Sequence, residues 1–96
     1  MTQVAQESAR YKRSDRVDET RVGDRVVLFQ RDTGSGVVLN PTGSLIWDSL
    51  VAPQSPADLA RVLATKFPSA SADQIEADVF TYLGSLVEQS LIAGDT

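Results

Sequence analysis

The sequence of 96 residues contains no cysteine and no histidine. Without cysteine the chain forms no disulfide and no thiolate metal site. Without histidine it lacks the usual general base and the commonest protein metal ligand. Its serines have no histidine to activate them, no G-x-S-x-G motif is present, and the run 34–36 (GSG) lacks the length and the lysine of a P-loop. These absences argue against an enzyme, and we expect no catalytic residue, no metal and no cofactor.

Long hydrophobic runs are also missing. No apolar stretch approaches the roughly 20 residues that a membrane-spanning helix needs. The first ten residues, MTQVAQESAR, lack the apolar segment of a secretory signal. We therefore expect a cytoplasmic protein with no membrane partner.

Basic residues are scarce in most of the chain. The net charge is −4, and residues 33–96 contain only two basic residues against seven acidic ones. The segment 71–89 has no lysine or arginine and carries four acidic residues. DNA-binding surfaces require clustered positive charge on the element that reads the groove. The charge distribution therefore argues against a nucleic-acid partner.

The N-terminal half indicates short strands. Residues 1–13 are polar and aperiodic, which predicts a flexible N-terminal tail, and 14–93 would form one domain. The segments 16–22, 25–30 and 36–39 are rich in β-prone residues and are separated by glycine-containing turns. Within 25–30, alternation places Val26, Leu28 and Gln30 on one face. A small antiparallel sheet with an open edge follows.

The second half predicts three helices. Asn40-Pro41 begins the first, which ends before Pro53, and Ser55-Pro56 begins the second, which Pro68 ends. Ser71 with Gln74 fits a capping box, and the third helix runs to about Gln89. Leu91-Ile92 would fold back onto the core. The order predicts an α+β domain with a three-stranded antiparallel sheet followed by three helices.

Two surfaces are candidates for binding. The strand at 36–39 would be an edge strand, which another chain can extend by β-augmentation, although protected edges without a ligand are more common. On the third helix, Asp78, Tyr82, Ser85 and Gln89 fall on one polar flank beside the apolar stripe. This flank is either one wall of a peptide groove or an ordinary amphipathic boundary. Trp47 is interpreted as a core anchor.

The sequence resembles the PqqD-like family in three segments: 37–50 (VVLNPTGSLIWDSL), 56–67 (PADLARVLATKF) and 77–92 (ADVFTYLGSLVEQSLI). The resemblance covers about residues 24–92, and its strength lies in the order and spacing of the motifs. The residues that match the family pattern are Leu39-Asn40, Ile46-Trp47, Leu59, Leu63, Asp78-Val79, Leu83, Leu86 and Leu91-Ile92.

The resemblance implies a RiPP recognition element, a winged-helix-like fold in which the leader of a ribosomally made precursor peptide adds as a strand beside the third strand. Carried over, the third strand would supply the backbone pairing, the third helix the opposite wall, and two apolar residues the floor. The implied peptide-binding residues are Val37, Val38 and Leu39 for pairing, Asp78, Tyr82, Ser85 and Gln89 for the wall, and Ile75 and Val79 for the floor.

The resemblance also implies partners. The Asn-Pro-Thr-Gly turn and the stand-alone length are similar to the B1-type protein of lasso peptide pathways, which implies a separate leader peptidase or modifying enzyme. An alternative within the family is a peptide chaperone for a radical SAM enzyme. An alternative of another class is a winged-helix DNA-binding protein, with the third helix as the recognition helix. Exchange of a strand or helix between copies would give a homodimer in so small a domain.

Overall fold

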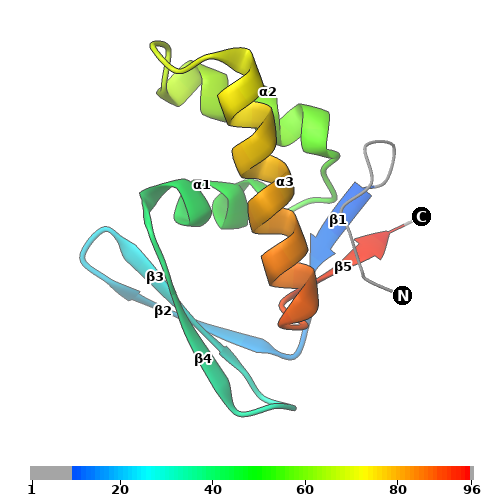
Figure 1. The fold of residues 1–96 in the computed structure, drawn as a ribbon. Coiled ribbons are helices and arrows are strands. Elements are labelled where there is room, and N and C mark those ends of the chain that lie inside the picture. The colour runs from blue at the N-terminus through cyan, green and yellow to red at the C-terminus, as the bar shows by residue number, and fades with distance from the viewer. Residues whose placement is uncertain (1–9, 96) are drawn as a thin grey trace.

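The computed structural model describes residues 10–95 as two small sheets and three helices (Figure 1). The helices gather on one side of a three-stranded antiparallel sheet, in the strand order β2-β3-β4, and a two-stranded sheet of β1 and β5 lies beside them. The elements are β1 (Arg10–Arg13), β2 (Val17–Val22), β3 (Arg25–Gln30), β4 (Ser35–Leu39), α1 (Pro41–Ser49), α2 (Pro56–Lys66), α3 (Ala72–Glu88) and β5 (Ile92–Asp95). The predicted α+β class with three sheet strands followed by three helices is confirmed.

The central strand β3 has one buried and one open face, as its alternation predicts. Val26, Leu28 and Gln30 are buried, whereas Phe29 is exposed. Across the ladder, Leu28 lies opposite Val37 and Val26 lies opposite Leu39. Directly opposite residues in an antiparallel pair share a face, so these two residues of β4 also point to the core.

Each helix begins at a capping side chain. Asn40 Oδ1 accepts a hydrogen bond from the backbone N–H of Gly43 at 2.8 Å, and Ser55 forms a complete capping box with Asp58. Ser71 Oγ likewise accepts from the N–H of Gln74 at 3.1 Å. The predicted box at Ser71 is only half formed, however, because the Gln74 side chain does not accept the Ser71 backbone N–H and instead donates from Nε2 to Asp78 Oδ1 at 2.9 Å.

The core lies between β3 and the three helices. Its largest fully buried side chains include Leu28, Ile46, Leu59 and Leu83. Trp47 is 2% exposed, which confirms its interpretation as a core anchor. Apolar stripes on the helices and the inward face of β3 therefore supply most of the buried surface, as hydrophobic packing of a two-layer domain requires.

The prediction of a flexible tail over 1–13 is wrong for its last four residues, which form β1. Tyr11 is 4% exposed and exchanges backbone hydrogen bonds with Gln54. Arg13 donates from Nε and Nη2 to the Trp47 carbonyl oxygen at 3.1 and 2.7 Å, and its guanidinium lies 4.5 Å from the indole centroid. Burial of a single aromatic ring and these contacts with α1 order the strand. Residues 1–9 of the predicted tail lie outside the described residues.

The partner of β1 is the strand that follows α3. Ser90 adopts the left-handed region with a φ of 59°, and the Leu91 N–H donates back to the Leu86 carbonyl at 2.9 Å. This tight end of α3 turns the chain so that Leu91 and Ile92 are buried, which confirms the predicted core contact. The continuation as β5 was not predicted.

Candidate peptide-binding site

The edge of the three-stranded sheet is β4. Within residues 10–95 this strand pairs only with β3, in the register Val27 opposite Val38 and Phe29 opposite Gly36. One side of its backbone therefore has no strand partner in the described part of the chain. Unpaired N–H and C=O groups on such an edge are a template for another extended chain.

The three predicted pairing residues of β4 share a backbone edge but differ in their side chains. Leu39 is buried, Val37 is half-buried against the core, and Val38 is 60% exposed on the outer face of the sheet. Their side chains do not form one surface. What they hold in common is their place on the edge strand, whose alternate residues direct their main-chain N–H and C=O groups away from β3. The Leu39 carbonyl also accepts a hydrogen bond from Ser44 Oγ at 3.4 Å.

On α3 the four predicted wall residues lie at successive turns on one side. Asp78, Tyr82 and Gln89 are half-buried, and Ser85 is exposed. Gln89 Nε2 donates to Ser85 Oγ at 3.0 Å, and Asp78 Oδ1 accepts from Gln74 Nε2 at 2.9 Å. Side chains four residues apart on a helix are neighbours, so these bonds orient the side chains at the two ends of the flank.

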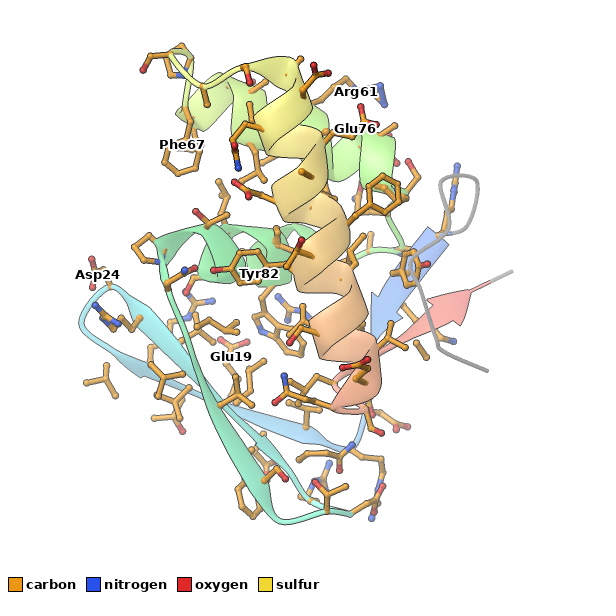
Figure 2. The ribbon with its side chains drawn as sticks, viewed as in Figure 1. Glu19, Asp24, Arg61, Phe67, Glu76 and Tyr82 are labelled. Carbon is orange, nitrogen blue, oxygen red and sulfur yellow. The ribbon has the colours of Figure 1, made fainter. Side chains whose placement is uncertain are left out.

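Tyr82 links this flank to the first turn of α1, which follows β4 in the chain. Its side chain points from α3 toward α1 in Figure 2, and a Cβ placed on Gly43 would lie 2.9 Å from Tyr82 Cε1. Gly43 is in the first turn of α1, directly after β4 and the cap Asn40. The middle of α3 and the first turn of α1 therefore meet at the Tyr82 ring.

The two predicted floor residues are less accessible than expected. Ile75 is 5% exposed, and Val79 is fully buried in the core. Val79 therefore lies behind the surface and supports it from within. Ile75, by contrast, lines a cavity that the sequence did not reveal.

That cavity has a volume of about 480 Å³, within the size range of small-ligand pockets. It lies where the start of α1, the end of α2 and the first turns of α3 converge. Ile75 and Asp78 are the predicted site residues that line it, and Phe67 is 39% exposed at its wall. The other lining residues are Thr42, Leu63, Lys66, Pro68, Ser69 and Ala70.

Sequence reasoning missed this cavity because helices distant in sequence form it. The sequence pointed the other way for Phe67, which follows Leu59 and Leu63 at helical spacing and is therefore predicted to lie in the apolar stripe. In the structure it is the C-cap of α2 and is 39% exposed. An aromatic side chain left open at a helix end marks either an interaction surface or a pocket wall.

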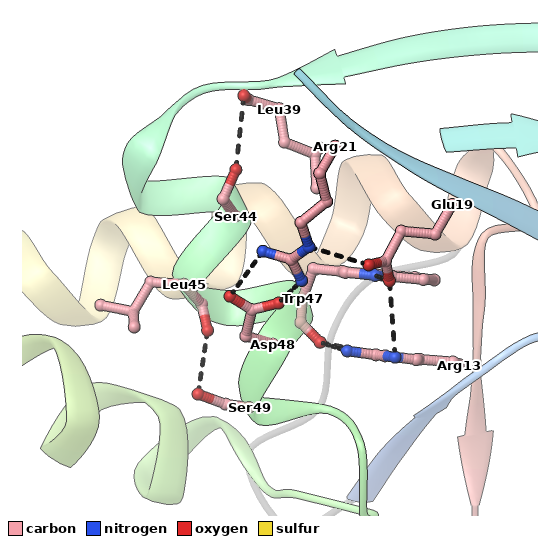
Figure 3. Close-up of polar contacts among 9 residues, drawn as sticks. All are labelled: Arg13, Glu19, Arg21, Leu39, Ser44, Leu45, Trp47, Asp48 and Ser49. Atoms are coloured by element: carbon pink, nitrogen blue, oxygen red, sulfur yellow. Dashed lines mark hydrogen bonds and ion pairs between the residues drawn. The ribbon is translucent and has the colours of Figure 1, made fainter. Parts of the chain in front are cut away.

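A polar cluster on the other side of α1 holds the sheet to the helices (Figure 3). Trp47 Nε1 donates to Glu19 Oε1 at 2.7 Å, and Arg21 and Arg13 lie 3.0 and 3.7 Å from the same carboxylate. The hydrogen bond from Trp47, followed by the bond and charge of Arg21, lowers the pKa of Glu19. Arg21 also pairs with Asp48. These contacts fix β2 and β1 against α1 and are structural.

Among the described residues, no three potential metal-ligating side chains gather at one point. None of the helices in residues 10–95 is both long and apolar enough to cross a membrane.

The fold is that of a small α+β recognition domain with an edge strand beside a helical wall, and comparisons with known proteins identify its family. The chain belongs to the PqqD family, because the family model described as "Coenzyme PQQ synthesis protein D (PqqD)" matches residues 25–92. This result confirms the family resemblance. No curated protein sequence matches the chain.

Solved structures extend the comparison. TbiB1 in complex with the TbiA(beta) leader peptide is 28% identical, with a TM-score of 0.80 over 88% of this chain and 98% of that chain. A lasso peptide synthetase B1 complexed with the leader peptide is 24% identical, with a TM-score of 0.74 over 86% and 96% of the two chains.

The third structure is the PqqD truncation of Methylobacterium extorquens PqqCD, a functional and stand-alone RiPP recognition element. It is 15% identical, with a TM-score of 0.76 over 93% of this chain and 94% of that chain. The likenesses to this protein and to the lasso peptide synthetase B1 show the fold alone. The fold of this chain is that of a RiPP recognition element.

Proposed function

We propose that the chain is a non-catalytic domain that binds the leader region of a ribosomally synthesised precursor peptide by strand addition to β4. The observation that carries this proposal is its likeness, over nearly the whole length of both chains, to TbiB1 in complex with a leader peptide. The edge position of β4 supplies the physical counterpart, because its outer side has no partner strand within residues 10–95.

The proposed mode of binding uses the edge of β4 on one side and the α3 flank on the other. Main-chain groups within the stretch Val37, Val38 and Leu39 would pair with the leader at alternate residues, and such pairing depends little on leader sequence. Side chains of an added strand alternate between two faces. Those on the inner face would meet the α3 flank at Tyr82, Ser85 and Gln89, which would supply the selectivity.

The cavity at the start of α3 would extend the site beyond the strand. β4 is five residues long, and a leader that continues past Leu39 would approach Thr42 and the cavity behind it. Apolar Ile75 and Phe67 would accept an apolar leader side chain there. Lys66 and Asp78, which also line the cavity, would orient polar groups of the same residue.

The domain would act through effective concentration. A leader held on β4 presents the attached precursor to a separate leader peptidase or modifying enzyme as a near-intramolecular substrate. We favour a lasso peptide pathway because the two leader-peptide complexes, TbiB1 and the lasso peptide synthetase B1, are 28% and 24% identical to this chain, whereas the PqqD truncation is 15% identical. A cytoplasmic location is the expectation from the sequence. A chaperone role for a radical SAM enzyme is the alternative within the family.

Isothermal titration calorimetry with a synthetic leader, taken from the short precursor gene nearest to this gene, tests the proposal. We expect a dissociation constant of about 1 μM or below, equivalent to about −8 kcal/mol. A scrambled peptide of the same composition is the control. The absence of both heat and competition at tens of micromolar for every neighbouring precursor would contradict the proposal.

Backbone N-methylation of the leader tests strand addition itself without altering the protein. Each N-methyl group removes one donor, and only alternate residues of an added strand donate to β4. Affinity should therefore fall at every second position, by a factor of about 2 to 12 for a lost hydrogen bond of about 0.5–1.5 kcal/mol. Losses that follow no alternation would exclude pairing with a strand edge.

A further inference from the structure

The backbone conformation at position 43 does not require a glycine. Among the glycines of the described residues, only Gly23 and Gly34 have a positive φ, and Gly43 lies in the first turn of α1 with helical geometry. Glycine inside a helix is less favourable than alanine. The reason for glycine at this position must therefore be the space that its missing side chain leaves.

The Tyr82 ring fills that space. A Cβ on Gly43 would lie 2.9 Å from Cε1 and 3.4 Å from Cδ1 of Tyr82, inside van der Waals distance. The backbone of Gly43 has little freedom to retreat, because its N–H donates to the cap Asn40 at 2.8 Å. A side chain at position 43 would therefore displace the ring.

The ring occupies a critical point of the proposed site. Asp78, one turn before Tyr82 on α3, lines the cavity, whereas Ser85 and Gln89 lie on the turns that follow. Tyr82 thus lies between the cavity and the rest of the α3 flank, with its ring turned toward α1 (Figure 2). A leader that pairs with β4 and reaches the cavity must pass this ring.

We propose that Gly43 is a positioning residue for leader binding. Because Gly43 has no side chain, the Tyr82 ring can pack against α1 at this position. In that orientation the ring leaves room for a leader to reach the cavity. This inference rests on the proposed function. It assigns no peptide contact to Gly43 itself. Its effect acts entirely through Tyr82.

A double-mutant cycle with the synthetic leader tests the coupling. Gly43→Ala should weaken leader binding at least tenfold, because the displaced ring enters the passage. Gly84→Ala is the matched control: Gly84 also lies inside a helix, and nothing lies within 4 Å of an added Cβ. This control should bind as the wild type does. In a Tyr82→Ala background, Gly43→Ala should change affinity by less than twofold.

Two results would overturn the inference: wild-type affinity in Gly43→Ala, or an equal loss in both Tyr82 backgrounds. A second measurement needs no leader. The chain has two tyrosines, so aromatic NMR spectra should show the Tyr82 resonances shifting in Gly43→Ala while those of Tyr11 remain in place.

Unshifted Tyr82 resonances in Gly43→Ala would also refute the packing of the Tyr82 ring against Gly43, whether or not leader binding changes. If the wild-type protein binds no leader but the Tyr82 resonances shift in Gly43→Ala, the proposed function is refuted and the packing of Tyr82 against Gly43 is supported.

Discussion

The hydrogen bond between Glu19 and Trp47 joins β2 to α1 through a buried donor. Trp47 is almost fully buried, and its indole N–H donates to Glu19 Oε1 at 2.7 Å. Glu19→Ala would leave that donor without its acceptor, at a cost of about 1–3 kcal/mol in the free energy of unfolding. Urea denaturation monitored by Trp47 fluorescence measures the change.

The neighbouring residue provides the control for that substitution. Asp18 is exposed and lies 3.6 Å from Arg31, so Asp18→Ala removes the same charge from a surface ion pair worth about 0–1 kcal/mol. Equal destabilisation by the two substitutions would mean that charge, and not the indole hydrogen bond, accounts for the effect.

The same carboxylate makes stability depend on pH. The hydrogen bond from Trp47, with Arg21 and Arg13 nearby, lowers the pKa of Glu19 from its ordinary value of 4.5. A group whose pKa is lowered by folding stabilises the native state above its unfolded pKa, and this contribution is lost as the pH falls through the folded pKa. Glu19→Gln should therefore flatten the decline of the melting temperature below pH 4.5.

The flattening should be partial. The pKa of Asp58 is lowered by hydrogen bonds from Ser55 and Arg61, and that of Asp32 is lowered by its bond with Arg16, so both carboxylates keep their share of the acid dependence. Thermal unfolding between pH 7 and pH 3 compares the two proteins. Identical slopes would show that Glu19 does not contribute to acid sensitivity.

Among the elements, those with local signals were predictable. Alternation located β3 residue by residue, and the caps Asn40, Ser55 and Ser71 located the start of each helix. The strand β1 had no such signal, because RYKR contains one apolar position and its order depends on contacts with α1, with Gln54 and with β5. Long-range contacts of this kind are not encoded in local pattern.

Part of the candidate site was likewise predictable from local sequence pattern, and part was not. The α3 flank could be predicted from helical spacing, since residues 78, 82, 85 and 89 follow one side of the helix. The cavity could not, because Thr42, Phe67 and Ile75 belong to three different helices or their ends, and only tertiary packing brings them together. The role of Gly43 was equally hidden, as it depends on a contact 39 positions away along the chain.

Removal of β1 tests whether this strand is part of the folding unit. Deletion of residues 1–13 removes the buried Tyr11 ring and the bonds of Arg13 to Trp47. Loss of a buried large aromatic side chain alone costs about 3–5 kcal/mol, a large share of the 5–15 kcal/mol typical of a whole domain. Thermal unfolding should show a severely destabilised or unfolded protein.

Deletion of residues 1–9 is the matched control, because it keeps every contact described for β1. If both deletions melt as the full chain does, β1 is dispensable and the domain begins at residue 14.

For the molecule as a whole, the charge of α3 distinguishes a peptide ligand from a nucleic-acid ligand. A winged-helix DNA-binding protein would use α3 as its recognition helix, but α3 carries acidic residues and no basic ones. Phosphates would be repelled from it. The acidic helix and the open strand edge together favour a peptide ligand over a nucleic acid.

Leader binding should stabilise the entire domain, because an unfolded chain offers no strand edge. A ligand at about a hundredfold excess over its dissociation constant adds about 2.7 kcal/mol to the free energy of unfolding. For a domain of this size each kcal/mol raises the melting temperature by about 4–8 °C, so saturating leader should raise it by about 10 °C or more. Differential scanning fluorimetry measures this shift, with a scrambled leader and a duplex DNA as controls.

The variants sharpen this test. Glu19→Ala should lower the melting temperature of the free protein and leave the leader-induced shift unchanged, since its contacts lie on the other side of α1 from the peptide. Gly43→Ala should do the reverse, with a nearly normal free protein and a reduced shift. A DNA-induced shift that disappears with added salt, or a leader shift reduced equally by both variants, would contradict the separation of the binding surface from the polar cluster.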